Sequence, residues 1–505
     1  MTKMLPLILV LVGFLRGADV NAASCSYADV SSAYGSATTG DVLIVPSCGS
    51  TAWSGNTLTI SKQITVRGQT SCSGTGATLS CIAGTTISNT QPIFIINANG
   101  ARVTGFTLTG GANGKGLIET TSSASGWRVD HVRLTPSLGG TARGAFAYGF
   151  GGGLFDHVYV DTASGGIDVD GADGENGEYA VCETLEANCD GTHSWQTPLT
   201  FGSAASVYIE DSYFNFSSVL DGAFDMYGGA RYCFRYNHVV GTNSGAHGLD
   251  SGGQRSVLQH EVYRNTFTHS GSSIYAIWNS RGGTHRLFEN VVTGDWGGFI
   301  YLQNYRTSNG YNWGICDGTG SLDQNTSGQH GYACRDQVGR GPSTSEMEWP
   351  TGSTFSQILA PGYTWSNTLN GSIMTVTDIV VGDSNGAQSA GSTVVDFIIL
   401  PNRDFYNEDS ENCEAAPSGN CTQGVGVGTL ANRPASCTTG VGYWATDQGN
   451  WNASGGSQGV LYVCTSSNTW TLQYTPYAYP HPLQDLAGRS RAGGGIRISG
   501  GIRTQ

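Results

Sequence analysis

The sequence predicts an all-β chain that folds as a right-handed, single-stranded parallel β-helix, with a short N-terminal capping helix and a small disulfide-bonded C-terminal appendage. Three observations lead to this prediction: a repeat of about 26 residues, an abundance of glycine and few long helical patterns. The 505 residues include 75 glycines and only 12% charged residues. This composition is typical of a chain that turns often, and a repeat is the first feature to expect in it.

The repeat consists of short apolar strands that each carry a polar residue at one recurrent position. These positions are 131, 157, 211, 237, 265 and 290, so the steps are 25 to 28 residues except for one that is about twice as long. One coil of a β-helix has this length, and successive coils stack at the strand spacing of ~4.8 Å. Asn and Asp at the recurrent position can form hydrogen-bonded ladders. A β-sandwich is the alternative, but sandwiches do not repeat at a fixed period.

The first residues predict export. Lys3 precedes an apolar run over residues 4–15, and small residues follow up to Ala22, which is the pattern of a signal peptide over residues 1–22. No later stretch has the roughly 18 apolar residues of a membrane span. The net charge of −14 makes nucleic acid an unsuitable partner. We therefore expect a secreted protein, extracellular or periplasmic and monomeric.

The remainder divides into three parts. Residues 23–410 are the predicted β-helix, and a short helix over residues 27–34 covers its open end. Residues 411–484, with two cysteine pairs and an aromatic string, predict a disulfide-bonded appendage. Residues 485–505, rich in Gly and Arg, predict a flexible tail.

Twelve of the 13 cysteines fall into close neighbours along the chain. The expected disulfides are Cys25 with Cys48, Cys72 with Cys81, Cys182 with Cys189, Cys316 with Cys334, Cys413 with Cys421, and Cys437 with Cys464. Cys233 is left over in an apolar strand, which indicates a buried thiol. No paired CxxC spacing occurs, so structural metal binding by cysteines is not expected.

The polar residues of the coils, the helical N-terminal segment and the glycine-punctuated strands together resemble the pectate lyase-like superfamily of right-handed parallel β-helices. The resemblance covers most of residues 27–410. It implies the fold more specifically than the reaction, since that superfamily includes polysaccharide lyases, hydrolases, epimerases and adhesins.

A second strand in each coil predicts where chemistry could occur. When Val169, Met226, Leu249, Ile277 and Leu302 are aligned as inward residues, their neighbours point outward onto one face. The outward set is Asp168, Asp170, Asp225, Tyr227, Asp250, Trp278, Tyr301 and Gln303. Just past these strands follow Arg231, Arg255, Asn279, Arg281, Asn304 and Arg306. Aromatic rings beside carboxylates and arginines suit a sugar chain, because pyranose faces stack on rings while hydroxyls and carboxylates take hydrogen bonds.

These residues are compatible with three functions. In a polysaccharide lyase acting on a uronate polymer, Asp168, Asp170, Asp225 and Asp250 would hold Ca²⁺ and Arg255 or Arg281 would be the base. In an inverting hydrolase, two of the carboxylates would act as acid and base. The segment around His247 faintly resembles the Gly-His-Gly segment of polygalacturonases, which implies a catalytic role for His247, although their Asp-Asp pair and Arg-x-Lys motif are missing. The third class is a non-catalytic glycan-binding or cell-surface adhesin. The lyase is favoured narrowly, because no required motif is absent.

Overall fold

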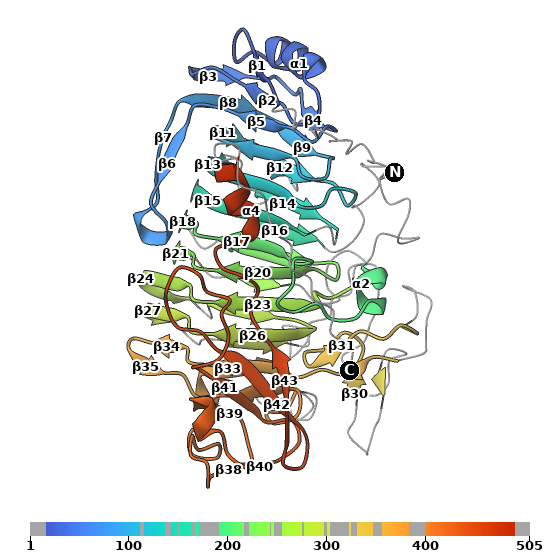
Figure 1. Cartoon of the computed structure of the whole chain (residues 1–505), viewed down its shortest axis with the longest axis vertical. Helices are drawn as coiled ribbons and strands as arrows, with labels where there is room; N and C mark the ends of the chain where they lie inside the picture. The colour runs from blue at the N-terminus through green and yellow to red at the C-terminus, as the bar shows by residue number, and fades with distance from the viewer. Residues whose placement is uncertain are drawn as a thin grey trace, which may run out of the picture.

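The computed structural model is mostly β, with parallel sheets. It describes residues 17–111, 116–136, 143–149, 152–162, 167–170, 191–216, 222–242, 244–246, 255–274, 277–296, 300–303, 323–324, 331–346, 356–382 and 399–489. The strands stack along the long axis of the molecule, from the N-terminal segments at one end to the C-terminal segments at the other (Figure 1).

Most of the described strands form three parallel rows. The first row is β1 (Asp19–Asn21), β2 (Val42–Ile44), β5 (Thr65–Arg67), β10 (Arg102–Thr104), β13 (Trp127–Pro136), β15 (Gly153–Thr162), β17 (Val207–Glu210), β20 (Arg231–Arg235), β23 (Gln259–Tyr263), β26 (Thr284–Phe288), β33 (Gly362–Trp365) and β37 (Phe405–Asn407). The second row is β3 (Cys48–Ala52), β8 (Thr85–Asn89), β11 (Thr107–Gly110), the second halves of β13 and β15, β18 (Tyr213–Phe216), β21 (His238–Val240), β24 (Thr266–Ile274), β27 (Val291–Trp296) and β34 (Thr368–Leu369). Because β13 and β15 run through both rows, these two rows belong to one sheet of 21 strands.

The third row consists of two sheets joined by one bridge. Its strands are β4 (Leu58–Ile60), β9 (Phe94–Ile96), β12 (Gly116–Thr120), β14 (Arg143–Tyr148), β16 (Ile167–Asp170), β19 (Phe224–Tyr227), β22 (Gly245–Ala246), β25 (Trp278–Ser280), β28 (Ile300–Gln303) and β36 (Ile379–Gly382). The bridge joins Ser244 to Trp278. One hydrophobic cluster draws inward side chains from all three rows, among them Val129, Phe214 and Met226.

The corner between the first and second rows has the same backbone conformation in successive repeats. A non-glycine residue with positive φ occurs there at His131, His157, Asp211, Tyr236, Arg264, Glu289 and Ser366. The next residue along the chain is Asn237, Asn265, Asn290 or Asn367 at the last four of these corners. Each of the first three asparagines donates from Nδ2 to the Oδ1 of the next, at 2.9 to 3.1 Å.

The predicted asparagine ladder is therefore confirmed at positions 237, 265 and 290 and extends to 367. At 131, 157 and 211 the prediction was wrong by one residue. Residues 131, 157 and 211 are the positive-φ residues of the corner, one position before the ladder. Ser212, not Asp211, occupies the ladder position, and its N–H donates to Asn237 Oδ1 at 3.0 Å.

The N-terminal helix α1 (Tyr27–Ser36) begins where a capping residue predicts it. Ser26 accepts a hydrogen bond from the Asp29 N–H at 3.2 Å, and the Asp29 carboxylate lies in the first turn, where the helix dipole favours negative charge. The helix lies beside β1 at the N-terminal end (Figure 1). Residues 1–16 lie outside the described residues, so the signal peptide stays a prediction. Cleavage after Ala22 would remove β1, which pairs with β2.

Four of the predicted disulfides are present: Cys25–Cys48, Cys72–Cys81, Cys413–Cys421 and Cys437–Cys464. Cys334 is also disulfide-bonded, while Cys182, Cys189 and Cys316 lie outside the described residues. Cys233 is a buried free thiol, as expected. Such bonds are typical of an oxidising compartment. In the part of the chain that the structure describes, no helix has the length and apolarity needed to cross a membrane.

The C-terminal residues pack against the first row. The sheet β39 (Val425–Gly428), β41 (Gly442–Ala445), β42 (Val460–Ser466) and β43 (Thr469–Tyr474) shares a hydrophobic cluster with outward side chains of that row, for example Phe288 and Trp365 with Trp444. Residues 474–489, here called the C-terminal strap, then run back along the row and end in α4 (Pro482–Arg489), which lies beside β13 to β17 (Figure 1). The flexible tail predicted from residue 485 therefore begins inside a helix, which continues to Arg489.

The strap covers buried charges that the first row points outward. Arg128 donates to the backbone oxygens of Leu483 and Gln484 at 3.1 and 3.2 Å. The Tyr474 hydroxyl donates to Glu261 at 2.7 Å. Glu261 has no exposed surface. The strap thus replaces water as the hydrogen-bond partner of these groups.

The burial of Glu261 predicts a pH effect on stability. Burial raises the pKa of this carboxyl, although hydrogen bonds from Tyr474 and from the Gly202 N–H oppose the rise. A raised folded-state pKa means that the folded protein binds this proton more tightly than the unfolded chain does. Proton binding at Glu261 therefore stabilises the folded state at low pH, and this stabilisation is lost as pH rises through the folded pKa. We expect Glu261→Gln, which mimics the protonated form, to remove this decline.

The measurement is the free energy of unfolding of the wild type and of Glu261→Gln at about pH 5 and about pH 8. The free energy of unfolding of Glu261→Gln should exceed that of the wild type by more at about pH 8 than at about pH 5. Glu414→Gln, at an exposed carboxylate, is the matched control and should follow the wild type at both values. A Glu261→Gln curve parallel to the wild type would contradict the prediction.

Candidate functional site

The outward face of the third row carries two columns of side chains on successive strands. Phe224 and Met226 of β19 point into the hydrophobic cluster, so Asp225 and Tyr227 point outward. The first column, in paired register, is Glu119, Phe146, Asp168, Asp225 and Gly245, followed by Asn279 and Tyr301. The second column is Tyr148, Asp170 and Tyr227, followed by Arg281 and Gln303.

The register places carboxylate-bearing residues on neighbouring strands. Asp168 pairs with Asp225, and Asp170 pairs with Tyr227. Paired residues of adjacent parallel strands lie about 4.8 Å apart. The side chain of Asp225 is half-buried, while only the backbone of Asp168 and Asp170 is described. The expected proximity of these three residues is therefore found in the backbone register.

Aromatic rings lie on the two strands that flank β16. Phe146 stacks on Tyr148 with ring centroids 4.4 Å apart, and Phe146 also meets Tyr227 edge to face at 5.8 Å. Phe146 and Tyr227 are buried, at 1% and 8% exposed, so the half-buried Tyr148 is the ring of this group that reaches the surface. The rings come from β14 and β19, the two strands that flank β16. Phe146 and Tyr148 were not predicted as site residues, although the alternation of Ala145-Phe-Ala-Tyr148 carries the same inward and outward pattern as β16 and β19.

Beyond β19 the predicted alignment is wrong by three residues. Ala246, not Leu249, pairs with Met226, and Ser280, not Ile277, pairs with Leu302. As a result Asn279 occupies the outward column, and its side chain lies over Gly245, where a Cβ would collide with the Asn279 Oδ1. Gly245 therefore leaves room for Asn279 to reach across β22.

The same shift moves Trp278 into the core. Its side chain is fully buried, and its indole Nε1 donates to the Tyr232 hydroxyl at 3.1 Å. The prediction that Trp278 offers an exposed ring to a sugar is wrong. Tyr301 is half-buried on the outward column, as expected, and Gln303 accepts a hydrogen bond from Arg281 Nε at 3.2 Å.

Arg231 and Arg255 do not line this face. Arg231 donates to the backbone oxygens of Ser194 and Thr197 at 2.7 Å, at the C-terminal end of α2 (Thr192–Gln196), and its burial lowers its pKa to about 10. These hydrogen bonds hold α2 against the first row.

Arg255 has no exposed surface and forms a buried ion pair. Its guanidinium donates to both carboxylate oxygens of Asp336, at 2.7 and 2.5 Å, and lies 3.3 Å from Glu346. A guanidinium in such a pair keeps its proton, because the two carboxylates stabilise the charged form. Arg255 is therefore unsuitable as the base of an elimination. His247, Asp250 and Arg306, also predicted as site residues, lie outside the described residues.

Sequence reasoning missed a second group of polar residues, at the corner between the first and second rows. His131 contacts the adjacent Asp130, and His157 contacts the adjacent Asp156, each through Nδ1, at 2.7 and 2.8 Å. The ligand atoms of His131, Asp156 and His157 lie within 4.8 Å of one another. The signal was visible in the sequence as an Asp-His pair that recurs after one period, but both pairs were interpreted as ladder residues.

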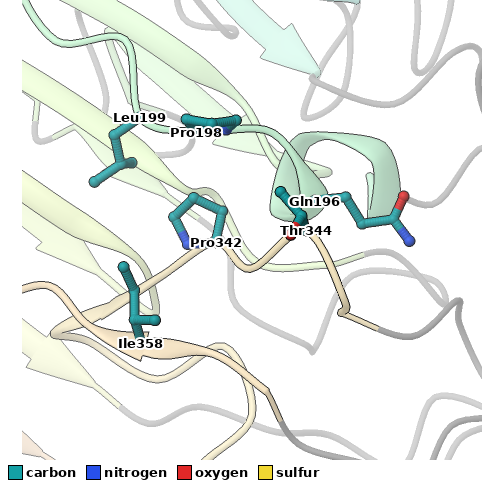
Figure 2. Close-up of a pocket in the computed structure, with 6 residues that line it drawn as sticks. All are labelled: Gln196, Pro198, Leu199, Pro342, Thr344 and Ile358. Atoms are coloured by element: carbon teal, nitrogen blue, oxygen red, sulfur yellow. The ribbon is translucent and has the colours of Figure 1, made fainter.

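A pocket of about 300 Å³ lies away from both groups, between the segment after α2 and β32 (Ile358–Leu359). Figure 2 shows its lining side chains, which are Gln196, Pro198, Leu199, Pro342, Thr344 and Ile358. None of them is charged, and the amide of Gln196 donates to the Glu346 backbone oxygen at 2.7 Å. The pocket therefore offers no acid, base or nucleophile.

Comparisons of this chain with protein-family models, with curated proteins and with solved structures find no match.

Proposed function

We propose that the chain is a right-handed parallel β-helix in which the three strand rows are the faces of successive coils. The regular order of the rows along the chain and the parallel pairing of neighbouring strands, offset by one repeat, support this proposal. Parallel connections within a sheet are almost always right-handed. In this arrangement α1 caps the first coil.

On this fold, we propose that the protein is secreted and that it binds and cleaves a uronate-containing polysaccharide on the outward face of the third row. The single observation that supports this most is the paired register of Asp168 with Asp225 and of Asp170 with both Tyr227 and the half-buried Tyr148. Carboxylates next to aromatic rings suit a polymer that is both hydroxylated and charged.

The favoured reaction is β-elimination. Carboxylate oxygens are the ligands that Ca²⁺ prefers, so Asp168, Asp170 and Asp225 are the residues that would hold it. A bound Ca²⁺ would supply positive charge that acidifies the proton next to the uronate carboxylate. Arg281 is the proposed base, because among the predicted bases Arg255 is held in a buried ion pair.

In that step Arg281, in its neutral form, takes the proton next to the carboxylate, and the electron pair of the broken C–H bond forms a carbon–carbon double bond. The glycosidic oxygen leaves from the next ring carbon and takes up a proton from water, and the resulting hydroxide takes the proton from Arg281. The products are one chain with a new non-reducing end that is unsaturated and one chain with a new reducing end. Asn279 and Tyr301, on the same face, are proposed to position the sugar next to this centre.

The test measures ultraviolet absorbance of unsaturated products when the full chain is mixed with a panel of purified uronate polymers. We expect activity that EDTA abolishes and Ca²⁺ restores. Asp225→Asn should lower the rate on the order of a hundredfold or more, the scale seen when a group that stabilises transition-state charge is lost. Asp161→Asn, on the second row, is the matched control and should keep the rate.

Each of the other possible results of this assay would reject part of the proposal. New reducing ends without unsaturated products would assign an inverting hydrolase in place of the lyase. Binding without any product would assign a glycan-binding protein or adhesin. An unchanged rate in Asp225→Asn would reject the third-row site while leaving the activity.

A further inference from the structure

Two Asp-His pairs lie on adjacent coils in the same orientation. His131 on β13 and His157 on β15 occupy equivalent corner positions, with φ of 52° and 53°. Their imidazole rings are stacked, with centroids 4.7 Å apart and an interplanar angle of 7°. The parallel pairing of the two strands therefore holds two identical ligand groups side by side.

Buried arginines hold the two carboxylates in place. Asp130 accepts two hydrogen bonds from Arg102, both at 2.6 Å, and Asp156 accepts two from Arg128, at 2.7 and 2.8 Å. Neither carboxylate has exposed surface. Each carboxylate accepts two hydrogen bonds from a guanidinium, which makes each a charged acceptor for the neighbouring histidine.

An ionised carboxylate next to Nδ1 fixes the tautomer of each histidine. Nδ1 carries the proton that is donated to the aspartate, which leaves Nε2 as the nitrogen that can bind a metal. Within the described part of the chain, no hydrogen bond engages Nε2 of His131 or His157. The side chains are 35% and 16% exposed. Because Nδ1 faces the buried carboxylate, Nε2 lies on the solvent side of each ring.

This arrangement has the features of a prepared metal site. Histidines that bind metal commonly donate the other ring N–H to a carboxylate, which orients the ring and makes the ligand nitrogen more basic. We propose that His131 and His157 bind one divalent transition-metal ion of the Zn²⁺, Ni²⁺ or Cu²⁺ class through their Nε2 atoms. Asp130 and Asp156 orient the two rings, and water completes the coordination.

Binding one ion requires the two rings to turn toward each other. A metal–nitrogen bond of about 2.0 to 2.1 Å allows two nitrogens on one ion to be at most about 4 Å apart. The ring centroids lie 4.7 Å apart and the rings are nearly parallel, at 7°, so the two Nε2 lone pairs point in the same direction. The rings must therefore tilt out of the parallel stack until both lone pairs converge on the ion.

This site is independent of the proposed cleavage site. It lies at the corner of the first and second rows, whereas Asp168 and Asp225 belong to the third row. The chemistry differs as well, since imidazole favours transition metals and carboxylate oxygens favour Ca²⁺. Loss of one function therefore does not imply loss of the other.

The experiment uses the full chain after removal of metal with EDTA, titrated with Zn²⁺ by calorimetry in the presence of excess Ca²⁺. We expect one Zn²⁺ per chain that Ca²⁺ does not displace. His131→Gln and His157→Gln should each weaken binding by at least about tenfold, as expected when one of two protein ligands is removed. His238→Gln, at a half-buried histidine on β21, is the matched control and should leave the affinity unchanged.

Electron paramagnetic resonance of the unchanged chain with one equivalent of Cu²⁺ provides a second measurement that does not depend on a variant. Coupling to two imidazole nitrogens is the expected signature. The proposal is overturned if Zn²⁺ does not bind, if both histidine variants bind as tightly as the wild type, or if the spectrum shows fewer than two imidazole nitrogens. In those cases the stacked histidines only shape the corner of the coil.

Discussion

Replacing Arg235 by Met is expected to lower the free energy of unfolding by about 3 to 5 kcal/mol, the scale for breaking a buried ion pair by removing one partner. Arg235 is fully buried and contacts Glu210 Oε2 through Nε and Nη2, at 2.7 and 2.6 Å. It also donates to the backbone oxygens of Tyr477 and Ala478 in the C-terminal strap, at 2.7 and 2.8 Å. Methionine fills much of the volume but leaves the Glu210 charge and two strap carbonyls without their donor.

Chemical denaturation of the full chain measures this loss. Arg133→Met is the matched control, because Arg133 and its partner Asp161 are each 35% exposed and such pairs contribute at most about 1 kcal/mol. Adding Glu210→Gln to Arg235→Met should recover part of the stability if the uncompensated carboxylate is the main cost. If Arg235→Met alone is no less stable than Arg133→Met, the strap does not depend on this ion pair.

The features that could be predicted from the sequence are those set by short-range pattern. The asparagine ladder follows from a fixed period, because Asn237, Asn265 and Asn290 come at the same point of successive sequence repeats. The disulfides follow from cysteines that are neighbours along the chain, as in Cys413–Cys421. Inward and outward alternation also predicted the register of β16 with β19 correctly.

The errors begin where local pattern allows two alignments. Between β19 and β28 the rule that large apolar residues point inward aligns Leu249 with Met226 and Ile277 with Leu302, whereas the strands pair Ala246 with Met226 and Ser280 with Leu302. Ile277 is itself buried in the core, so the burial of one residue does not determine the register of its strand.

The arginines show a second limit. Arg255 was predicted as a rim residue because it follows a predicted strand, yet its partners Asp336 and Glu346 lie 81 and 91 residues further along the chain. Arg231 likewise meets carbonyls at the end of α2, 37 residues earlier. Partners at such distances depend on how the segments between the strands fold back onto the sheets, and the sequence repeat does not encode this.

Replacing Asn265 by Leu is expected to cost about 3 kcal/mol or more, since each buried polar group left without a partner costs about 1 to 3 kcal/mol. Asn265 is 1% exposed. Its Oδ1 accepts from the N–H and Nδ2 of Asn237, at 2.9 and 3.1 Å, and its Nδ2 donates to the Phe234 backbone oxygen at 2.8 Å and to Asn290 Oδ1 at 3.0 Å. Leucine matches the shape but leaves two donors of Asn237 and the Phe234 oxygen unsatisfied.

The control is Asn215→Leu, at a half-exposed asparagine whose Nδ2 donates to Asp161 at 3.1 Å. It should cost less than about 1 kcal/mol, because water can replace the lost partner. Comparable losses in the two variants would mean that the ladder adds nothing beyond ordinary side-chain contacts. A much larger loss at Asn265 would show that the positive-φ corners depend on the asparagine that follows them, since the ladder satisfies the backbone N–H groups that these corners leave without a strand partner.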